Sequence, residues 1–493
     1  MKTKEKHKTV IIDWKPNKNL DKPIYLQIVE YICNKISNGH WLIGSYLPSQ
    51  RELSKLFEVN RSTIVSAMDE LVSLGIIESS FGGGTKIISN TWSLLISKEN
   101  LDWNKYVKSG LFKSNNSTIQ TIIKLEFEDY IRLGTGELSP SLFPHHMMNK
   151  IFNKLSTKAY SLNYTEPLGL IDLRIAISNR LKKLGINTNP SSILITSGSL
   201  QALQLISISM IKKGSTVFTE DPSYLKSLEI FQSAGINLSG IPMDNEGIKY
   251  WDINNSLKTI DRNLYNCLLY TIPSFQNPTG TTMTTKRRKD LFEFCKKHQL
   301  PVIEDCAYSE LWIDEAPPLP LKSMDVNGMV LYVGTISKTL APGLRIGWII
   351  GPESIIERLG DVKMQLDYGA SSLSQLVLTE FFESGLYDEH LTYLRKELKI
   401  RRDNAINSLN EYFKDLGTWN IPSGGFYIWL TLKNNISIDK LFKESLKEHI
   451  LLNIGSIYSF KTNHSLRISY AYEDCLTFRN AICKLSKIIR NIS

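Results

Sequence analysis

The spacing of apolar residues predicts two different kinds of structure along the chain. Over residues 23–39, 47–59 and 60–75, apolar positions recur every three or four residues, which is the pattern of short amphipathic helices. Residues 76–88 have the pattern of two short strands joined by a run of glycines. From about residue 150 onward, short apolar runs alternate with helical patterns, which predicts an α/β domain with a largely parallel sheet.

The N-terminal elements follow the order of a winged helix-turn-helix, in which three helices precede a hairpin. Ser49 and Glu52 have the spacing of a capping box at the start of the second helix, and Asn60 is the expected N-cap of the third. The positions that we expect to be buried on these two helices are Leu53, Leu56, Phe57, Ile64, Ala67, Met68, Leu71 and Val72.

This fold directs the N-terminal residues of its third helix toward base edges in the major groove of DNA. The candidate DNA-binding residues are Arg51, Arg61, Ser62, Thr63 and Lys86. Arginine can form two hydrogen bonds with guanine, whereas hydroxyls and helix N-termini suit phosphate. The alternative is that Arg51 and Arg61 are ordinary solvated surface charges.

Composition narrows the class of protein. A chain of 493 residues is too long for one core, and about three domains are expected. The net charge of +9 is compatible with a polyanionic partner. No run approaches the ~18 apolar residues of a membrane span, and the basic N-terminus lacks the apolar segment of a secretory signal. The six cysteines are scattered, so we expect reduced thiols, no metal site and a cytoplasmic protein.

Residues with useful chemistry follow the predicted strands of the α/β part, and ligands of open α/β sheets bind at this end of the strands. Gly198 and Ser199 follow a strand and open a helix, where they could bind a phosphate. Asp305 ends the strand-like "PVIED", so burial requires it to have a partner. Lys338 and Arg345 lie just beyond the strand-like "VLYVG", and an asparagine lies in the turn "QNPTG".

A lysine, a buried acid, a phosphate site and an arginine together suit pyridoxal 5'-phosphate. A neutral lysine amine forms an imine with the cofactor aldehyde, and a carboxylate keeps the pyridine nitrogen protonated. The alternative is that Lys338 binds phosphate in an ordinary nucleotide site, but no P-loop or dinucleotide fingerprint accompanies it.

Residues 20–90 resemble a GntR-type DNA-binding domain. The resemblance rests on "LPSQRELSKLFEVNRSTI" and on the wing sequence "GGGTKI". One departure is Ser66, where many members carry a second arginine in the recognition helix. This difference affects the expected number of base contacts and not the fold.

Residues from about 125 to 490 resemble a fold-type I aminotransferase domain. The matching motifs are "NYTEPLGLIDLR", "TSGSLQAL", "EDPSY", "QNPTG", "EDCAY", "SKTLAPGLRIGW" and "LRISYAY". The resemblance implies that Lys338 is the imine lysine and that Asp305 pairs with the pyridine nitrogen. Asn277 and Tyr308 would form hydrogen bonds with the ring hydroxyl, and Tyr224 would stack on the ring.

The same resemblance implies a phosphate site and an effector site. The residues that would hold the phosphate are Gly198, Ser199, Ser337, Arg345 and, from a second subunit, Tyr164. Arg467 would bind the carboxylate of an amino acid, and Lys226, close to Tyr224, would tune the choice of ligand. The alternative for Arg467 is a surface arginine on a strand.

A GntR-type head joined to an aminotransferase-like body is the architecture of the MocR/GabR family of bacterial transcriptional regulators. The expected segments are a flexible N-terminus (1–19), a winged helix-turn-helix (20–90), a linker (91–126) with a helical piece around Trp103 to Val107, and an aminotransferase-like domain (127–493) divided into a large α/β part (about 150–370) and a small α+β part (about 371–493). The resemblance implies a homodimer in which each head lies over the partner's body.

The predicted function is therefore a pyridoxal-phosphate-dependent regulator that senses an amino compound, or the cofactor itself, through the Lys338 imine and changes its binding to double-stranded operator DNA. A competing hypothesis is a working aminotransferase that the head only tethers to DNA. A third is a regulator that has lost its cofactor, but Lys338, Asp305 and Arg345 argue against it.

Overall fold

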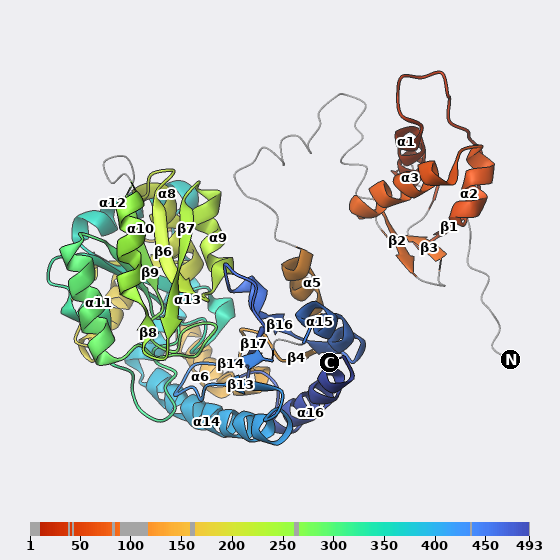
Figure 1. Ribbon diagram of the computed structural model, residues 1–493. Coiled ribbons are helices and arrows are strands. Elements are labelled where there is room, and N and C mark those ends of the chain that lie inside the picture. The colour runs from red at the N-terminus through yellow and green to blue at the C-terminus, as the bar shows by residue number, and fades with distance from the viewer. Residues whose placement is uncertain are drawn as a thin grey trace. The chain divides into compact units, whose positions relative to one another are not determined.

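The computed structural model describes residues 10–37, 40–41, 44–80, 84–88, 117–157, 163–260, 266–433 and 436–492. The chain divides into two compact units, Met1–Gly110 and Leu111–Ser493, and each is described by itself (Figure 1). Within the described ranges, no helix combines the length and the apolar character that crossing a membrane requires. All six cysteines are free thiols.

The first unit is a winged helix-turn-helix, as the sequence predicted. Its helices are α1 (Ile24–Ser37), α2 (Gln50–Phe57) and α3 (Arg61–Ser73). Its three-stranded antiparallel sheet has the order β1-β3-β2 and is formed by β1 (Tyr46–Leu47), β2 (Ile77–Ser80) and β3 (Gly84–Ile87). The wing is the β2–β3 hairpin, in which Ile77 pairs with Ile87.

The helix caps of this unit lie at the predicted residues. The capping box of α2 is present, because Ser49 Oγ accepts from Glu52 N at 3.3 Å and Glu52 Oε2 accepts from Ser49 N at 2.9 Å. Asn60 is the N-cap residue of α3, as predicted, although its side chain makes no capping hydrogen bond.

Two of the eight residues expected in the buried stripe are exposed. Leu56 is 43% exposed and Val72 is 46% exposed, whereas the other six are buried. On α2 only Leu53 and Phe57, which are four residues apart, contact the core. Leu56 lies three positions after Leu53, outside this row, and faces solvent. On α3 the neighbouring Leu71 occupies the core instead of Val72.

The second unit contains an eight-stranded, largely parallel sheet with the order β5-β12-β11-β10-β9-β6-β7-β8. Its strands are β5 (Ile193–Thr196), β6 (Thr216–Asp221), β7 (Asn237–Asp244), β8 (Gly247–Ile248), β9 (Cys267–Thr271), β10 (Val302–Asp305), β11 (Val330–Thr335) and β12 (Gly347–Ile350). Only β12 and β8 run antiparallel to their neighbours. The predicted α/β architecture is confirmed.

Helices cover both faces of this sheet (Figure 1). One face packs against α8 (Ser199–Met210), α9 (Leu225–Ser233) and α12 (Glu353–Leu366). The other face packs against α6 (His145–Ser156), α7 (Ile171–Lys182), α10 (Ile253–Thr259), α11 (Thr285–Lys297) and α13 (Ser372–Glu383). Successive residues of β5 point to opposite faces, because Ile193 and Ile195 join one cluster and Leu194 joins the other.

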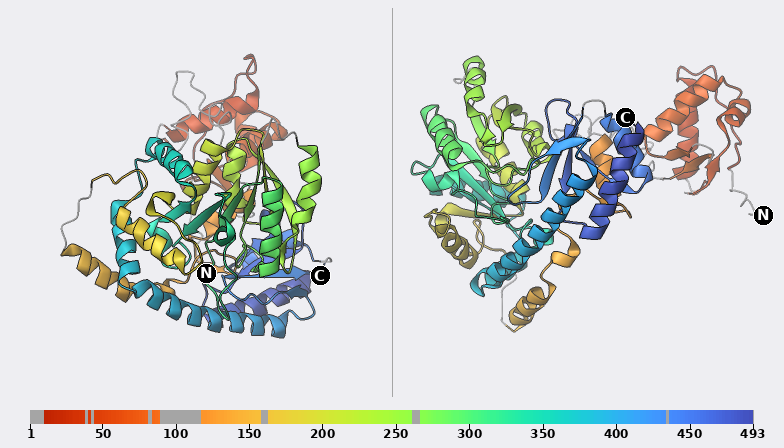
Figure 2. Two further views of the ribbon diagram at one scale, coloured as in Figure 1. Left: turned by 90° about the vertical axis from the view of Figure 1, so that its left-hand side faces the viewer. Right: turned by 60° about the horizontal axis from the view of Figure 1, so that its bottom comes forward.

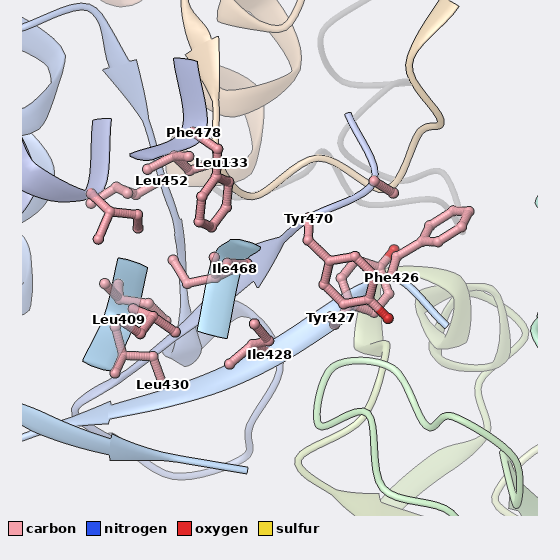
Figure 3. Close-up of a cluster of buried hydrophobic side chains, with 14 of the residues drawn as sticks. Leu133, Leu409, Phe426, Tyr427, Ile428, Leu430, Leu452, Ile468, Tyr470 and Phe478 are labelled. Carbon is pink, nitrogen blue, oxygen red and sulfur yellow. The ribbon is translucent and has the colours of Figure 1, made fainter. Parts of the chain in front are cut away.

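A smaller α+β part follows, built on a sheet of order β13-β14-β17-β16. Its elements are α14 (Leu386–Tyr412), β13 (Gly417–Trp419), β14 (Tyr427–Leu432), α15 (Ile438–Lys447), β16 (Asn453–Ile454), β17 (Ser465–Ser469) and α16 (Cys475–Ile492). Helices α14 and α16 lie side by side along this sheet (Figure 2). Their apolar faces form one core with strand residues such as Ile428 and Ile468 (Figure 3).

One described helix of the second unit lies within the predicted linker. Within residues 91–126 the structure describes α5 (Ser117–Leu125) and Glu126, and both lie in the second unit. The helical piece expected around Trp103 to Val107 lies outside the described residues. Shortly after α5, the short strand β4 (Ile131–Arg132) pairs with β15 (Ile450–Leu451), which ties this segment to the small α+β part.

Candidate functional site

A cavity of ≈ 220 Å³ in the second unit collects six of the predicted site residues. These are Tyr224, Lys226, Asn277, Tyr308, Lys338 and Arg467. They come from positions more than 200 residues apart and from both the large sheet and the small α+β part. The fold therefore assembles side chains that the sequence distributes over separate motifs.

Lys338 lies in the turn that follows β11, and its amine is half-buried in this cavity. Its Nζ donates a hydrogen bond to the carbonyl oxygen of Gly136 at 2.8 Å. A Cβ at Gly136 would lie 3.0 Å from the hydroxyl of Tyr427 and 3.6 Å from Nζ, so a side chain there would crowd the amine. Glycine at this position leaves the amine accessible to a ligand.

Asp305 ends β10 and is 8% exposed. Its carboxylate accepts from the hydroxyl of Tyr270 at 2.7 Å and from the backbone N–H of Ala307 at 3.1 Å. Burial raises the pKa of Asp305, while these two hydrogen bonds and the charge of Lys338 oppose that rise. The acid thus has the partners that a buried carboxylate requires.

Arg467 on β17 is the centre of a buried hydrogen-bond network. Its Nη1 donates to Asn277 Oδ1 at 2.9 Å, and its Nε donates to the Gly134 carbonyl at 3.2 Å. Asn277 Nδ2 donates to the Tyr308 hydroxyl at 3.4 Å, which lies 2.9 Å from the Tyr427 hydroxyl. Arg467 is 3% exposed, so the alternative of a surface arginine is wrong.

The guanidinium of Arg467 lies over two aromatic rings and has no acidic partner. Its Cζ is 4.3 Å from the ring centroid of Tyr427 and 4.7 Å from that of Tyr458. No carboxylate in the described ranges forms a salt bridge with it. A buried arginine of this kind is suited to a carboxylate from a ligand.

The predicted phosphate residues gather where β5 meets α8. Gly198 has φ +89° at the N-cap of α8, and a Cβ there would lie 2.5 Å from Nη2 of Arg345. Glycine is therefore required at this position for two reasons. Arg345 Nη2 donates to the Ser197 carbonyl at 3.1 Å, and Thr335 Oγ1 donates to Ser337 Oγ at 3.0 Å. A helix N-terminus beside a guanidinium suits a phosphate dianion.

The remaining predicted residues of this unit differ in exposure. Tyr224 is half-buried at the start of α9, and burial raises the pKa of its hydroxyl to about 12, so the ring is neutral at neutral pH. Lys226 is exposed at the rim of the cavity. Tyr164 is 84% exposed, lies 5.4 Å from the ring of Tyr368, and does not line the cavity of its own chain.

The candidate DNA-binding residues lie on the surface of the first unit. Arg51, Arg61, Ser62 and Lys86 are exposed and Thr63 is half-buried. The three cations form no salt bridge with any carboxylate of the described residues. Both the DNA-contact interpretation and that of solvated charges fit this arrangement.

Comparisons with known proteins agree with the division of the chain into two units. Residues 24–87 match the family "Bacterial regulatory proteins, gntR family", and residues 128–482 match "Aminotransferase class I and II". The chain is 50% identical over 460 residues to the "Uncharacterized HTH-type transcriptional regulator YisV" of Bacillus subtilis (strain 168), covering 93% of this chain and 94% of that protein. The chain belongs to the MocR-type family of transcriptional regulators.

A second relative of this MocR-type chain is matched over the relative's full length. The HTH-type transcriptional regulator NorG of Staphylococcus aureus (strain N315) is 36% identical over 460 residues, which is 90% of this chain and 100% of NorG. The aminotransferase-like unit also resembles the solved kynurenine aminotransferase of Pyrococcus horikoshii, with a TM-score of 0.74 and 31% identity over 81% of this chain and 99% of that one.

The MocR-type site contains residues that the sequence motifs did not reveal. Seven such residues line the cavity or hold its members in place: Glu126, Thr135, Gly136, Tyr270, Tyr427, Asn453 and Tyr458. One available signal was the pair of glycines in "LGTGELSP", since glycines in a non-helical segment mark close approach of the backbone. The others lie in ordinary helical or strand patterns and have no local signature.

Proposed function

We propose that this regulator binds pyridoxal phosphate at Lys338 and reports an amino compound to operator DNA. The observation that carries the proposal is the position of α5, the first described helix after the DNA-binding unit in the chain. Its residues Ile119, Ile122 and Ile123, together with Glu126, line the same cavity as Lys338. A ligand in that cavity contacts the segment through which the chain continues toward the head.

The residues of the second unit fit the cofactor. Asp305, buried and hydrogen-bonded, would keep the pyridine nitrogen protonated. Asn277 and Tyr308 would form hydrogen bonds with the ring hydroxyl, and Tyr224 would cover the ring. When bound, pyridoxal phosphate supplies an aldehyde that condenses with amines and a ring that withdraws electrons.

The phosphate would lie at the start of α8, where Gly198 and Ser199 offer backbone N–H groups, Ser337 a hydroxyl and Arg345 a positive charge. Arg467 would hold the carboxylate of an amino acid ligand, because it is buried without an acidic partner among the described residues.

The regulator is proposed to act as a homodimer with exchanged heads. The aromatic side chain of Tyr164, exposed and outside its own cavity, is available to the phosphate of a partner subunit. A ligand changes operator binding only if it has different affinities for two arrangements of the dimer. Contact between the ligand and α5 would provide such a difference if the two arrangements place α5 differently on the cavity.

A second candidate function is transamination. The cavity brings together a lysine, a buried acid and a carboxylate-binding arginine, and the unit is 31% identical to a solved aminotransferase. Steady-state turnover of amino acid and keto acid pairs at about 1 s⁻¹ or more would favour this function over a purely regulatory one.

The proposal is tested with Lys338→Ala and a matched control, Lys289→Ala, which removes an exposed lysine of α11. The wild type and the control should show visible absorbance of the bound cofactor, and amino acids should change their affinity for operator DNA. Lys338→Ala should lose both properties while keeping its ligand-free affinity for DNA. A native protein without visible absorbance after incubation with pyridoxal phosphate contradicts the cofactor assignment.

A further inference from the structure

Three oxygen-bearing side chains around the Lys338 cavity have no function in the scheme above. Asn453 on β16 is 5% exposed; its Nδ2 donates to the Tyr458 hydroxyl at 2.9 Å, but its Oδ1 has no hydrogen-bond partner among the described residues. Thr135 is 2% exposed, and its Oγ1 also makes no hydrogen bond there. Buried oxygens without donors are rare in folded proteins, and they indicate a missing partner.

The third group is Glu126, which directly follows α5. Its carboxylate is half-buried, lines the cavity, and forms no salt bridge within the described ranges. Burial raises the pKa of Glu126, while the charges of Lys226 and Arg467 and the hydroxyl of Thr135 oppose that rise. The other cavity carboxylate, Glu137, already pairs with Arg132 at 3.3 Å. Glu126 is thus the carboxylate of this cavity that is available to a ligand.

All three groups can accept a hydrogen bond from a ligand. The Asn453 amide oxygen and the Glu126 carboxylate accept only, and the Thr135 hydroxyl can accept while its own proton points toward Glu126. Thr135 lies close enough to influence the ionisation of Glu126, although the two make no hydrogen bond of normal length. Asn453 pairs across the sheet with Arg467, and its Cβ would lie 2.5 Å from a Cβ at Gly134. An ammonium group carries three donors and one positive charge, which matches two neutral oxygens and a carboxylate.

We propose that Glu126, Thr135 and Asn453 form a subsite for a second ammonium group, so that the effector is a diamino acid. This inference rests on the proposed function, in which Arg467 holds the carboxylate and Lys338 marks the place of the first amine. A dicarboxylic amino acid would bring a like charge against Glu126, and an apolar side chain would offer no donor to any of the three groups.

The wall of α5 suits the rest of such a ligand. Ile119 and Ile122 are each 5% exposed, and with Ile123 they give the cavity an apolar side beside Glu126. Methylene groups between the two amines would pack against this side. The ligand would therefore contact α5 twice, through its apolar chain and through its terminal charge.

The test uses the full-length protein saturated with pyridoxal phosphate and three amino acid probes: L-ornithine, L-norvaline, which lacks only the terminal amine, and L-glutamate. Isothermal titration calorimetry should find ornithine about tenfold or more tighter than norvaline, with glutamate weakest. Glu126→Gln should remove the preference for ornithine and leave the affinity for norvaline unchanged. The matched control, Glu128→Gln, alters an exposed carboxylate two residues away and should keep the preference.

A second variant protects the test against misfolding. If Glu126→Gln fails to bind the cofactor, Thr135→Val, which removes one acceptor at nearly constant volume, must show the selective loss of ornithine affinity. Equal binding of ornithine and norvaline by the wild type, or tightest binding of glutamate, overturns the subsite. Failure of the proposed function gives a different result, because the wild type then shows no cofactor absorbance and no amino acid changes its affinity for operator DNA.

Discussion

Asp305 and His390 are buried titratable groups with opposite ionisation requirements. In the proposed function Asp305 must be ionised to hold a protonated ring nitrogen, and hydrogen bonds from Tyr270 and the Ala307 N–H favour that state. His390, on α14, is 1% exposed and its Nε2 has no hydrogen-bond partner among the described residues, so burial keeps it neutral. Both groups link the behaviour of the protein to pH.

Removing the Tyr270 hydroxyl should make cofactor binding more sensitive to acid. Burial already raises the pKa of Asp305, and Tyr270→Phe removes a hydrogen bond that opposes the rise. The ionised form exists above the folded pKa and is lost as pH falls through it, so the variant should lose cofactor affinity at a higher pH. Fluorescence titrations of cofactor affinity at successively lower pH should show the loss beginning at a higher pH in the variant, with a deficit of up to about tenfold per unit of pKa difference. Tyr250→Phe, which alters a ring packed on Phe294, should follow the wild type.

The second prediction concerns stability in acid. Burial lowers the pKa of His390 to about 4, whereas an unfolded histidine titrates near 6.5. Stability is therefore fully present above about pH 6.5 and falls as pH drops toward 4, because only the unfolded chain takes up the proton. The loss should reach about 2 kcal/mol at pH 5. Urea unfolding should show that His390→Gln lacks this contribution, and an unchanged acid dependence in the variant would contradict the assignment.

At the scale of elements, we assign the two proposed recognition tasks to α3, for DNA, and to α5, for the ligand. Helix α3 presents Arg61 and Ser62 to solvent at its N-terminus, while Ile64 and Leu71 hold the helix to the core. Helix α5 places its isoleucines on the Lys338 cavity. Both helices are amphipathic, but the apolar face of α3 packs against its own unit's core, whereas that of α5 lines the Lys338 cavity.

Arg61→Ala should weaken operator binding by about 1–3 kcal/mol if Arg61 contacts a base. Ser73→Ala, at the other end of the same helix, is the matched control, because Ser73 is exposed and distant from the N-terminal turn. Fluorescence anisotropy with labelled operator DNA at several salt concentrations measures both. Equal affinities of the two variants, or an affinity that does not fall with rising salt, would favour the interpretation of Arg61 as a solvated charge.

The sequence predicts an element well when local interactions determine it and poorly when packing against other elements does. The start of α2 and the strands β10 and β11 were predicted closely, because a capping box and apolar runs act over a few residues. The exposure of Leu56 and Val72 was not predicted, since the width of the buried stripe depends on what the helix packs against. Helix α5 was assigned to a linker because its one apolar face is short and polar residues precede it in the sequence.

At the scale of the whole molecule, the proposed regulator couples a ligand site in one unit to DNA binding in the other. Such coupling is reciprocal by thermodynamic necessity: the factor by which a ligand changes operator affinity equals the factor by which operator changes ligand affinity. The described segment closest in the chain to the head is α5, and its Ile122 is 5% exposed on the cavity wall.

Truncating Ile122 should therefore reduce this coupling. With L-ornithine as the ligand, Ile122→Ala should reduce the coupling free energy by about 0.5–2 kcal/mol, which brings both factors equally closer to one. The ligand-free operator affinity should stay unchanged. Calorimetry with and without operator DNA, and anisotropy with and without ornithine, measure the two factors. Ile421→Ala is the control, because Ile421 is 67% exposed and lies outside the cavity. A variant with full coupling would exclude the route through α5.

The sequence by itself determined the parts of this regulator: the winged helix-turn-helix, the α/β body, and the lysine, acid and arginines that follow its strands. Local signals suffice for these, because caps, apolar periodicity and motif spacing act within one element. Only the tertiary structure decided that Glu126, Thr135 and Asn453 share a cavity with Lys338. They meet through the pairing of β4 with β15 and of β16 with β17, contacts between segments far apart in the chain that have no local signature.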